Sequence, residues 1–277
     1  MKCFQLVKTV LDELYALIPG DIASKDALIK ARLAYLQDKY KNLLRNAEPV
    51  DYNDPATRFA YLYRYVTSHA NLVYTLIDDS NYLPGLFGNA ALKVTCVGGG
   101  PGSDLLGILK YMMNNGLCIP VHCTLYDREQ AWGESWSDLD QKVGLNFKTS
   151  TFFQLFDVVD ASTWSFHTKY LNSDLFTMVY FLSEIYLLRQ YAEPFFMNLF
   201  CKAKPGSIYL FVDNNSPDFY NWFDSLANAS GLAVVESDEK VMNLPLDEQK
   251  ADLGEYFMKF GFPKLQPDIA YRICIRI

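Results

Sequence analysis

Hydrophobic residues recur at helical spacing through the first part of the chain. In the segment SKDALIKARLAYLQDKYKNLLRNA, apolar side chains lie near one face while most lysines and arginines lie elsewhere, and Ser24 is the predicted N-cap. A second helix is predicted after Asp54, with Pro55 at its first position, where the missing N–H costs nothing. Aromatic residues occur around much of this helix, which indicates that it packs between other elements. The pattern therefore predicts a helical N-terminal region over residues 1–90.

From Leu92 onward the pattern changes to short runs rich in β-branched and aromatic residues, separated by stretches long enough for a helix. These runs are LKVTCV, IPVHCTLYD, FKTSTFF, LFTMVYFL and SIYLFVDN, and nearly apolar strands of this kind are typical of a parallel sheet with helices on both faces. Two further runs, GLAVVESDEKVMNL and AYRICIRI, come with no comparable helix after the last strand, which is predicted to insert antiparallel. Residues 91–277 are therefore predicted to form an α/β domain, a mostly parallel, seven-stranded, doubly wound sheet with an antiparallel C-terminal strand.

Composition limits the classes of protein to consider. The chain has 277 residues, of which 50% are hydrophobic, so it can bury a substantial core. Its formal net charge of -7 offers no general electrostatic reason to bind nucleic acid or an anionic membrane. The six cysteines lie mostly in apolar runs, which is typical of reduced core residues in an intracellular protein. The N-terminal stretch lacks the continuous apolar run of a signal peptide or a membrane span, so a cytoplasmic or nuclear location is expected.

The stretch CVGGGPGSD follows the first predicted strand, where an open α/β sheet places the turn that approaches a ligand. A phosphate-binding P-loop needs a lysine after the last glycine, and Gly102 is followed instead by Ser103 and Asp104. A dinucleotide fingerprint would meet Ser103 at its third glycine, and Asp104 would place negative charge where a pyrophosphate binds, so an NAD-dependent oxidoreductase is the less favoured alternative. The remaining pattern, G-x-G-x-G at Gly98, Gly100 and Gly102, fits a ligand with an amino acid and a nucleoside but no phosphate.

With this turn, the chain from about Leu92 to its C-terminus resembles the class I S-adenosylmethionine-dependent methyltransferases. The resemblance implies S-adenosylmethionine as cofactor and methyl transfer to an oxygen or nitrogen acceptor on a small molecule, a protein or an RNA. It assigns cofactor contacts to a set of residues in and after the turn: Gly98, Gly99, Gly100, Gly102 and Asp104.

The later strands supply the other family positions. Asp127 ends the second strand, 25 residues after Gly102, and corresponds to the acid that binds the ribose hydroxyls. Its alternative role is to cap the helix beginning at Arg128. Arg128 is also a candidate cofactor contact. Asp157 and Val158 correspond to the adenine contacts. Either Phe153 or Phe156 is expected to cover the adenine ring.

The acceptor side of the site is expected beyond the fourth and fifth strands. Tyr180, Ser183 and Glu184 follow the fourth strand and Asn214 ends the fifth. Glu184, Tyr180 and Asn214 are the candidate catalytic residues, with Glu184 facing the acceptor, and Ser183 is a candidate cofactor contact. A helix cap is the alternative role for Glu184.

One position departs from the family pattern. The family usually has an acid two residues before the first glycine, and Cys96 stands there instead, so a non-catalytic S-adenosylmethionine-binding regulatory or scaffold protein stays open. Trp132 and Trp136 are one helical turn apart and are expected to pack in the core. The three histidines are too scattered to predict a metal site. The helical region is expected to cover the crevice and select an acceptor, while the sequence determines neither the acceptor nor the oligomeric state.

Overall fold

The computed structural model describes residues 1–45, 50–243, 247–264 and 266–277. The N-terminal region is helical, as expected, and its elements are α1 (Cys3–Leu17), α2 (Ile22–Lys41), α3 (Pro55–Tyr61), a π-helix (Leu62–Val66), α4 (Thr67–Asp79) and a 3-10 helix (Leu83–Gly88). Within the described ranges, no helix is both long and apolar enough to cross a membrane.

The helix caps test two predictions of the sequence. Asp54 caps α3 and accepts a hydrogen bond from the Ala56 N–H at 3.1 Å, with Pro55 in the first turn, as predicted. The prediction of Ser24 as the cap of α2 is wrong, because the helix begins three residues earlier and the Asp21 carboxylate accepts from the Ser24 N–H at 2.8 Å. Ser24 is therefore a residue of the first turn.

A seven-stranded sheet forms the centre of the molecule, with the order β3-β2-β1-β4-β5-β7-β6. Its strands are β1 (Leu92–Val97), β2 (Val121–Asp127), β3 (Thr149–Leu155), β4 (Leu175–Val179), β5 (Ile208–Asn214), β6 (Leu232–Val241) and β7 (Asp268–Arg276). β7 runs antiparallel to both of its neighbours, β5 and β6, whereas the pairs from β3 through β5 are parallel, so the predicted fold class is confirmed. Because β1 lies between β2 and β4, the sheet has its topological switch point beside the glycine turn.

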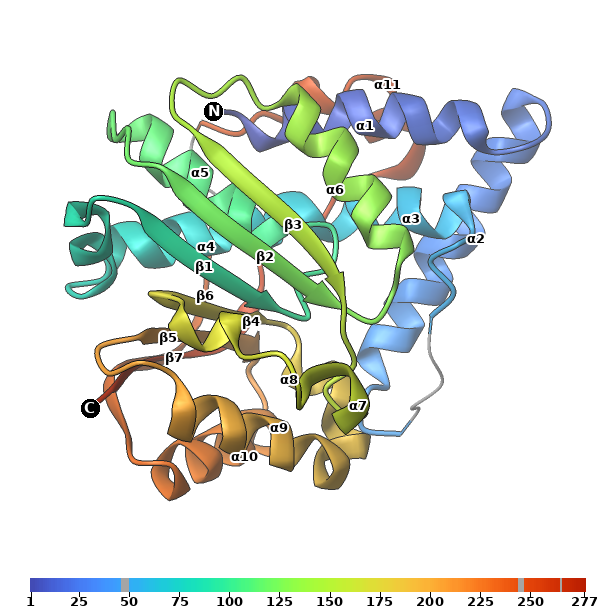
Figure 1. The fold of residues 1–277 in the computed structure, drawn as a ribbon. Helices are drawn as coiled ribbons and strands as arrows, with labels where there is room; N and C mark the ends of the chain where they lie inside the picture. Colours follow the sequence, from blue (N-terminus) through green and yellow to red (C-terminus); the bar gives the residue numbers. More distant parts are fainter. Residues whose placement is uncertain (46–49, 244–246, 265) are drawn as a thin grey trace.

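Helices cover both faces of this sheet. They are α5 (Ser103–Asn114), α6 (Ala131–Lys142), α7 (Ala161–Trp164), α8 (Leu182–Ile185), α9 (Arg189–Lys202), α10 (Pro217–Ala229) and α11 (Glu255–Phe260). Figure 1 shows α1, α4, α5 and α6 on one side of the sheet, and α9 and α10 on the other. Buried hydrophobic residues form two clusters, a first cluster with α1, α4, α5 and α6 and a second cluster with α9 and α10. Successive strand residues point to opposite faces, so Leu210 of β5 belongs to the first cluster and Phe211 to the second.

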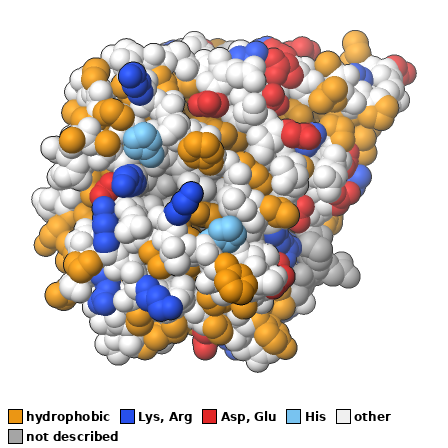
Figure 2. Space-filling view, viewed as in Figure 1, with side chains coloured by type: hydrophobic (Ala, Val, Ile, Leu, Met, Phe, Trp, Pro, Cys, Tyr) orange, Lys and Arg blue, Asp and Glu red, His pale blue; other side chains and the backbone are white. Residues whose placement is uncertain are grey.

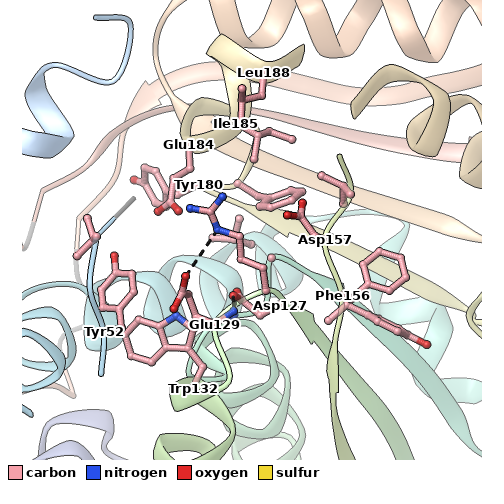
Figure 3. Close-up of a pocket in the computed structure, with 18 of the residues that line it drawn as sticks. Tyr52, Asp127, Glu129, Trp132, Phe156, Asp157, Tyr180, Glu184, Ile185 and Leu188 are labelled. Carbon is pink, nitrogen blue, oxygen red and sulfur yellow. Dashed lines mark hydrogen bonds and ion pairs between the residues drawn. The ribbon is translucent and has the colours of Figure 1, made fainter. Parts of the chain in front are cut away.

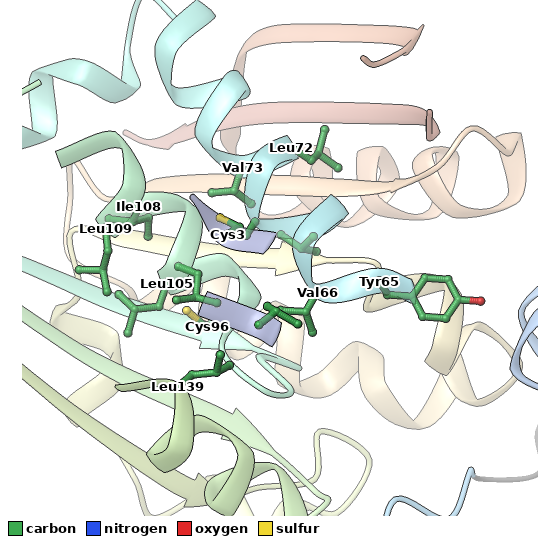
Figure 4. Packing of buried hydrophobic residues seen from close by; sticks show 14 of the residues in the cluster. Cys3, Tyr65, Val66, Leu72, Val73, Cys96, Leu105, Ile108, Leu109 and Leu139 are labelled. Carbon is green, nitrogen blue, oxygen red and sulfur yellow. The ribbon is translucent and has the colours of Figure 1, made fainter. Parts of the chain in front are cut away.

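The first cluster joins the two parts of the chain. Phe4 of α1 and Val73 of α4 are buried in the same cluster as Leu105 of α5 and the strand residue Cys96. Figure 4 shows Leu105 next to Cys96 and Cys3 next to Val73 in this cluster. The helical region therefore shares a core with the sheet, and the division of the chain at residue 90 stays a prediction.

Charge is unevenly distributed over the surface. In the view of Figure 2, acidic side chains gather toward α1 and α2, whereas basic side chains lie mainly over the other half of the face. The formal net charge of -7 is therefore not spread evenly over the molecule.

Candidate functional site

A large cavity lies at the carboxyl ends of β1, β2 and β4, at the switch point of the sheet. It encloses about 1080 Å³, counting its open mouth. Figure 3 shows side chains from the strand ends and from the N-terminal helical region pointing into it. A crevice in this position is where open α/β folds bind their ligands.

The glycine turn brings bare backbone to the cavity wall. Gly98 and Gly100 both line the cavity and have positive φ values of 66° and 49°. A Cβ on Gly98 would lie 2.0 Å from Cδ2 of Phe181, so a side chain is excluded there. A Cβ on Gly100 would meet no atom of the described residues within 4 Å, so this residue faces open space. A ligand can therefore approach the Gly100 backbone directly.

The two other glycines of the turn, Gly99 and Gly102, pack closely against neighbouring residues. Gly102, with φ 85°, precedes α5, and a Cβ there would lie 2.1 Å from Cε3 of Trp136. A Cβ on Gly99 would lie 2.8 Å from that of Cys96. Neither glycine is among the described residues that line the cavity. Both allow the turn to pack closely against its neighbours, and their assignment as ligand contacts stays a prediction.

Asp127 connects the end of β2 to the glycine turn. Its Oδ2 accepts a hydrogen bond from the Gly100 N–H at 3.0 Å, and its Oδ1 accepts from the Glu129 N–H at 2.9 Å. Burial raises the pKa of this carboxyl to about 6, and the two backbone donors lower it in part. Arg128 also lines the cavity, with its Nε 3.8 Å from a carboxylate oxygen of Glu129, the contact drawn as a dashed line in Figure 3.

The segment after β3 forms another part of the wall. Phe156, Asp157 and Val158 all line the cavity. The Asp157 carboxylate accepts from the Val159 N–H at 3.0 Å, which fixes the turn. Of the two phenylalanines expected to cover an adenine, Phe156 lines the cavity, whereas Phe153 packs about 3.1 Å from the position of a Cβ on Gly133. The residues expected at the adenine end therefore lie together.

Tyr180, directly after β4, has a strained backbone. With φ 56°, it is the only non-glycine residue of positive φ in the described part of the chain. Its N–H donates to the Val212 carbonyl at 2.7 Å, and its ring stacks on His69 with the centroids 4.3 Å apart. Among the residues that the structure describes, the buried hydroxyl of Tyr180 finds no hydrogen-bond partner. Strain of this kind is often retained at sites where a side chain must be placed accurately.

Glu184 lies in α8 and reaches the cavity. Its side chain is accessible to solvent through the cavity but is surrounded by protein atoms. Burial, and next the negative charge of Asp127, raises the pKa of Glu184 to about 7, while a hydrogen bond with Tyr40 lowers it in part. A carboxylate with a pKa near neutrality is suited to accept a proton.

A smaller cavity of about 290 Å³ adjoins the large one. Four residues line both cavities: Tyr40, Tyr61, Tyr180 and Glu184. Five line only the smaller one: Tyr65, His69, Ser183, Asn214 and Lys264. Two predicted site residues, Ser183 and Asn214, are thus brought to the smaller cavity. The structure does not bring them to the wall of the large one.

Asp104 lies behind the glycine turn, away from both cavities. Its Oδ2 accepts a hydrogen bond from the Thr177 hydroxyl at 2.6 Å, and Oδ1 accepts from the Ser103 hydroxyl at 3.3 Å. Burial raises the pKa of Asp104 to about 7. The side chain of Cys96 is fully buried nearby, and burial also raises the pKa of its thiol. Direct cofactor contact by Asp104 stays a prediction.

Several cavity residues were not identified from the sequence. Tyr40 and Tyr52 share a hydrogen bond between their hydroxyls at 2.6 Å, and Tyr52 lies 4.3 Å from Trp132, measured between ring centroids. Trp132 is buried in the core, as expected, and also lines the cavity. The aromatic density of residues 54–79 was a signal for one further lining residue, Tyr61. Which tyrosines face the cavity depends on how the helices pack against the sheet.

The described residues contain no group of three or more histidine, cysteine or acidic side chains that could hold a metal ion. Of the two adjacent residues His122 and Cys123, the histidine is exposed and the cysteine is buried, as expected for opposite faces of a strand.

No protein-family model and no curated protein matches the chain. Similar solved structures include a methyltransferase from Pyrococcus furiosus (10% identity, 75% of this chain and 82% of that chain, TM-score 0.44). Others are the CurJ carbon methyltransferase (9%, 91% and 68%, TM-score 0.45) and the StiE O-MT (13%, 73% and 71%, TM-score 0.43). These values describe a distant similarity of backbone structure, and they do not identify a methyl acceptor.

Proposed function

We propose that the protein is an S-adenosylmethionine-dependent methyltransferase whose cofactor binds in the large cavity. The observation that carries this proposal is that one cavity is lined by the Gly98 and Gly100 backbone, by Asp127 and by Asp157 with Val158. These are the positions that the family resemblance assigns to the methionine, ribose and adenine parts of the cofactor.

The lining residues fit such a ligand chemically. Gly100 leaves open space beside its backbone, so the extended methionine part can pass close to the turn. Each Asp127 oxygen accepts one backbone hydrogen bond and retains a lone pair for a ribose hydroxyl. Phe156 and Val158 offer apolar surface for an adenine ring.

The proposed chemistry requires alignment and removal of one proton. When bound, S-adenosylmethionine supplies a methyl group whose carbon–sulfur bond breaks, with the electron pair staying on sulfur, as the acceptor's lone pair bonds to the carbon. We assign Glu184 as the group that takes the proton lost by an acceptor O–H or N–H. Tyr40 lines the cavity beside Glu184 and lowers the pKa of its carboxyl in part, and we assign Tyr40 the role of orienting the base.

The acceptor is proposed to be reached through the helical region. The cavity is lined by Tyr40 of α2, by Tyr52, which precedes α3, and by Tyr61 of α3, so residues 1–90 are positioned to select the acceptor. An oxygen or nitrogen acceptor fits a site with a carboxylate base. A cytoplasmic or nuclear location remains part of the same proposal.

Calorimetry tests cofactor binding. S-adenosylmethionine, S-adenosylhomocysteine and NAD are titrated separately into the pure protein; we expect binding of the first two and none of NAD. Gly100→Ala should weaken binding by about 10-fold or more, because its methyl group enters the space used by the ligand. Gly116→Ala is the matched control, since Gly116 also has positive φ and open space but lies outside the cavity. Binding of NAD alone, or equal losses in both variants, would contradict the proposal.

Cys96 favours a second candidate function, that of a non-catalytic S-adenosylmethionine-binding protein. Its buried thiol replaces the acid that is usual at this position, which favours a protein that binds the cofactor and regulates or scaffolds a partner. Incubation with methyl-labelled S-adenosylmethionine and cell extract separates the two functions. The enzyme converts the cofactor to S-adenosylhomocysteine and labels an acceptor, whereas the regulatory protein binds it unchanged.

A further inference from the structure

The smaller cavity has a composition that indicates what it binds. Its walls include the aromatic rings of Tyr61, Tyr65, His69 and Tyr180. The centroids of the Tyr61 and Tyr65 rings lie 5.3 Å apart, and those of His69 and Tyr180 lie 4.3 Å apart. The cavity has about 290 Å³ when its opening to solvent is counted, which limits its occupant to one small group, and its aromatic walls favour a planar group that can stack on them.

The wall of this cavity includes one positive charge. Lys264 lines the smaller cavity only, and within the described residues its ammonium makes no hydrogen bond or ion pair. Its backbone is held by a hydrogen bond from the Lys264 N–H to the Arg64 carbonyl at 3.0 Å. His69, buried beside it, is kept neutral because burial lowers its pKa well below the usual value. Burial lowers the pKa of this ammonium, while the negative charges of Asp213 and Asp268 act in the opposite direction without forming an ion pair with it among the described residues. A half-buried ammonium that no carboxylate contacts directly can take an anion.

Glu184 supplies a negative charge to the same cavity. It lines both cavities and so lies at their junction, whereas Lys264, beside Tyr180, lines the smaller cavity alone. An anionic ligand would be repelled by Glu184 and attracted by Lys264, which orients it along the cavity. Its opposite end then lies at the junction, beside the proposed base.

The positively charged side chains of Lys264 and Arg64 disfavour an amine as the ligand. Aromatic walls with a carboxylate can also hold an ammonium group. Here, however, the Lys264 ammonium already lies 4.8 Å from the centroid of the Tyr180 ring. The Arg64 guanidinium lies 5.9 Å from that of Tyr65. A cationic ligand would therefore meet two rings that already face positive charges.

We propose that the smaller cavity binds the methyl acceptor, and that this acceptor is a small aromatic hydroxy acid with its carboxylate on Lys264 and its hydroxyl toward Glu184. This inference rests on the proposed function of the large cavity. The hydroxyl oxygen forms the new bond to the methyl carbon, and its proton passes to the Glu184 carboxylate. The carbon–sulfur electron pair leaves with the sulfur, so charges and atoms balance. Lys264 is a substrate-binding residue in this arrangement.

Binding of three matched phenols tests the proposal without turnover. The anionic 4-hydroxybenzoate, the neutral 4-hydroxybenzamide and the cationic 4-hydroxybenzylamine are titrated calorimetrically into protein saturated with S-adenosylhomocysteine, at fixed ionic strength. We expect the benzoate to bind about 10-fold or more tightly than the other two. Lys264→Met should remove this preference, and Lys264→Arg should retain most of it, because the charge is kept.

Matched variants guard against an effect on folding. Lys250→Met removes another lysine that lies over an aromatic ring, 3.9 Å from the centroid of Phe262, outside both cavities, and should change no affinity. Thermal unfolding of each variant confirms that it is folded; if Lys264→Met is not, Lys264→Gln replaces it. Tightest binding of the amine, equal binding of all three phenols, no binding, or a benzoate preference that survives loss of the Lys264 charge would each overturn the proposal.

Failure of this proposal can be separated from failure of the function on which it rests. Binding of S-adenosylhomocysteine is measured first, and its absence counts against the cofactor site alone. The phenol titrations are then repeated without it, and their order of affinities still decides what the smaller cavity binds.

Discussion

Glu184 is the residue whose environment bears most directly on the proposed chemistry. Burial holds its pKa at about 7, so it is a stronger base than an ordinary carboxylate and is still ionised above neutral pH. Because the base must be ionised to accept a proton, turnover should rise as the pH increases through about 7 and then level off.

Glu184→Gln should therefore lower kcat by about 100-fold or more and abolish this rise with pH. The dissociation constant for S-adenosylhomocysteine should stay the same, since the substitution keeps the side chain's size. Kinetics from pH 5.5 to 9, with calorimetry of the same samples, provide the measurement, and the exposed Glu193 of α9 supplies the control variant Glu193→Gln. Unchanged turnover with intact cofactor binding would remove Glu184 from the mechanism.

At the scale of elements, a buried ion pair and its hydrogen bonds connect four segments of the chain. Lys110 of α5 is fully buried, and its ammonium lies 2.8 Å from the equally buried carboxylate of Glu248. The same carboxylate accepts hydrogen bonds from the backbone N–H groups of Cys3 and Phe4, at 2.8 and 3.0 Å, at the start of α1. Asn71 of α4 also accepts from the Lys110 ammonium, at 2.7 Å. The pair therefore holds α1 and the segment at residue 248 against α5.

Lys110→Met should lower the free energy of unfolding by about 3–5 kcal/mol, because it leaves the Glu248 carboxylate buried without its counter-ion. Adding Glu248→Gln removes the stranded charge and should restore at least ~1 kcal/mol of this loss. Urea unfolding of the single and double variants measures both effects. Lys8→Met, which breaks an exposed pair with Asp12, should cost less than ~1 kcal/mol. A double variant less stable than Lys110→Met would contradict this account.

Elements were more predictable than their ends. The apolar runs predicted the strands because strands buried on both faces must be apolar at nearly every position. The start of α2 was predicted at Ser24 instead of Asp21, because both residue types cap helices and the intervening Ile22 and Ala23 do not distinguish the two starts. A boundary of this kind depends on which side chain reaches the free N–H groups.

At the scale of the whole molecule, the predictable part of the site is the part that topology brings together. Gly100, Asp127 and Asp157 follow successive strands, and the carboxyl ends of parallel strands meet at one edge of a sheet. His69 and Lys264 meet only because α4 and the segment before β7 pack against the same strand end. No local pattern encodes that meeting, so the smaller cavity could not be predicted from the sequence.

The buried acids give the whole protein a characteristic pH dependence. Burial raises the pKa of Asp104 to about 7 and that of Asp213 to about 6, so the folded state retains protons that the unfolded state has released. The free energy of unfolding due to these groups therefore falls as the pH rises from about 4 toward 7. His69 acts in the opposite direction below pH ~6.5, because its lowered pKa makes the folded state bind fewer protons than the unfolded state.

A variant of one acid separates these opposing effects. In Asp104→Asn the side chain still has an oxygen that can accept a hydrogen bond from the Thr177 hydroxyl, but it cannot ionise. The free energy of unfolding of this variant relative to the wild type should therefore be about 1–3 kcal/mol more favourable at pH 8 than at pH 5. Urea unfolding at both pH values measures this difference. Asp160→Asn alters an exposed helix cap whose pKa is already low, and its stability relative to the wild type should not change between the two values. If Asp104→Asn behaves like Asp160→Asn, then Asp104 is ionised in the folded protein well below pH 7, and its carboxylate must be stabilised by more than the hydroxyls of Thr177 and Ser103.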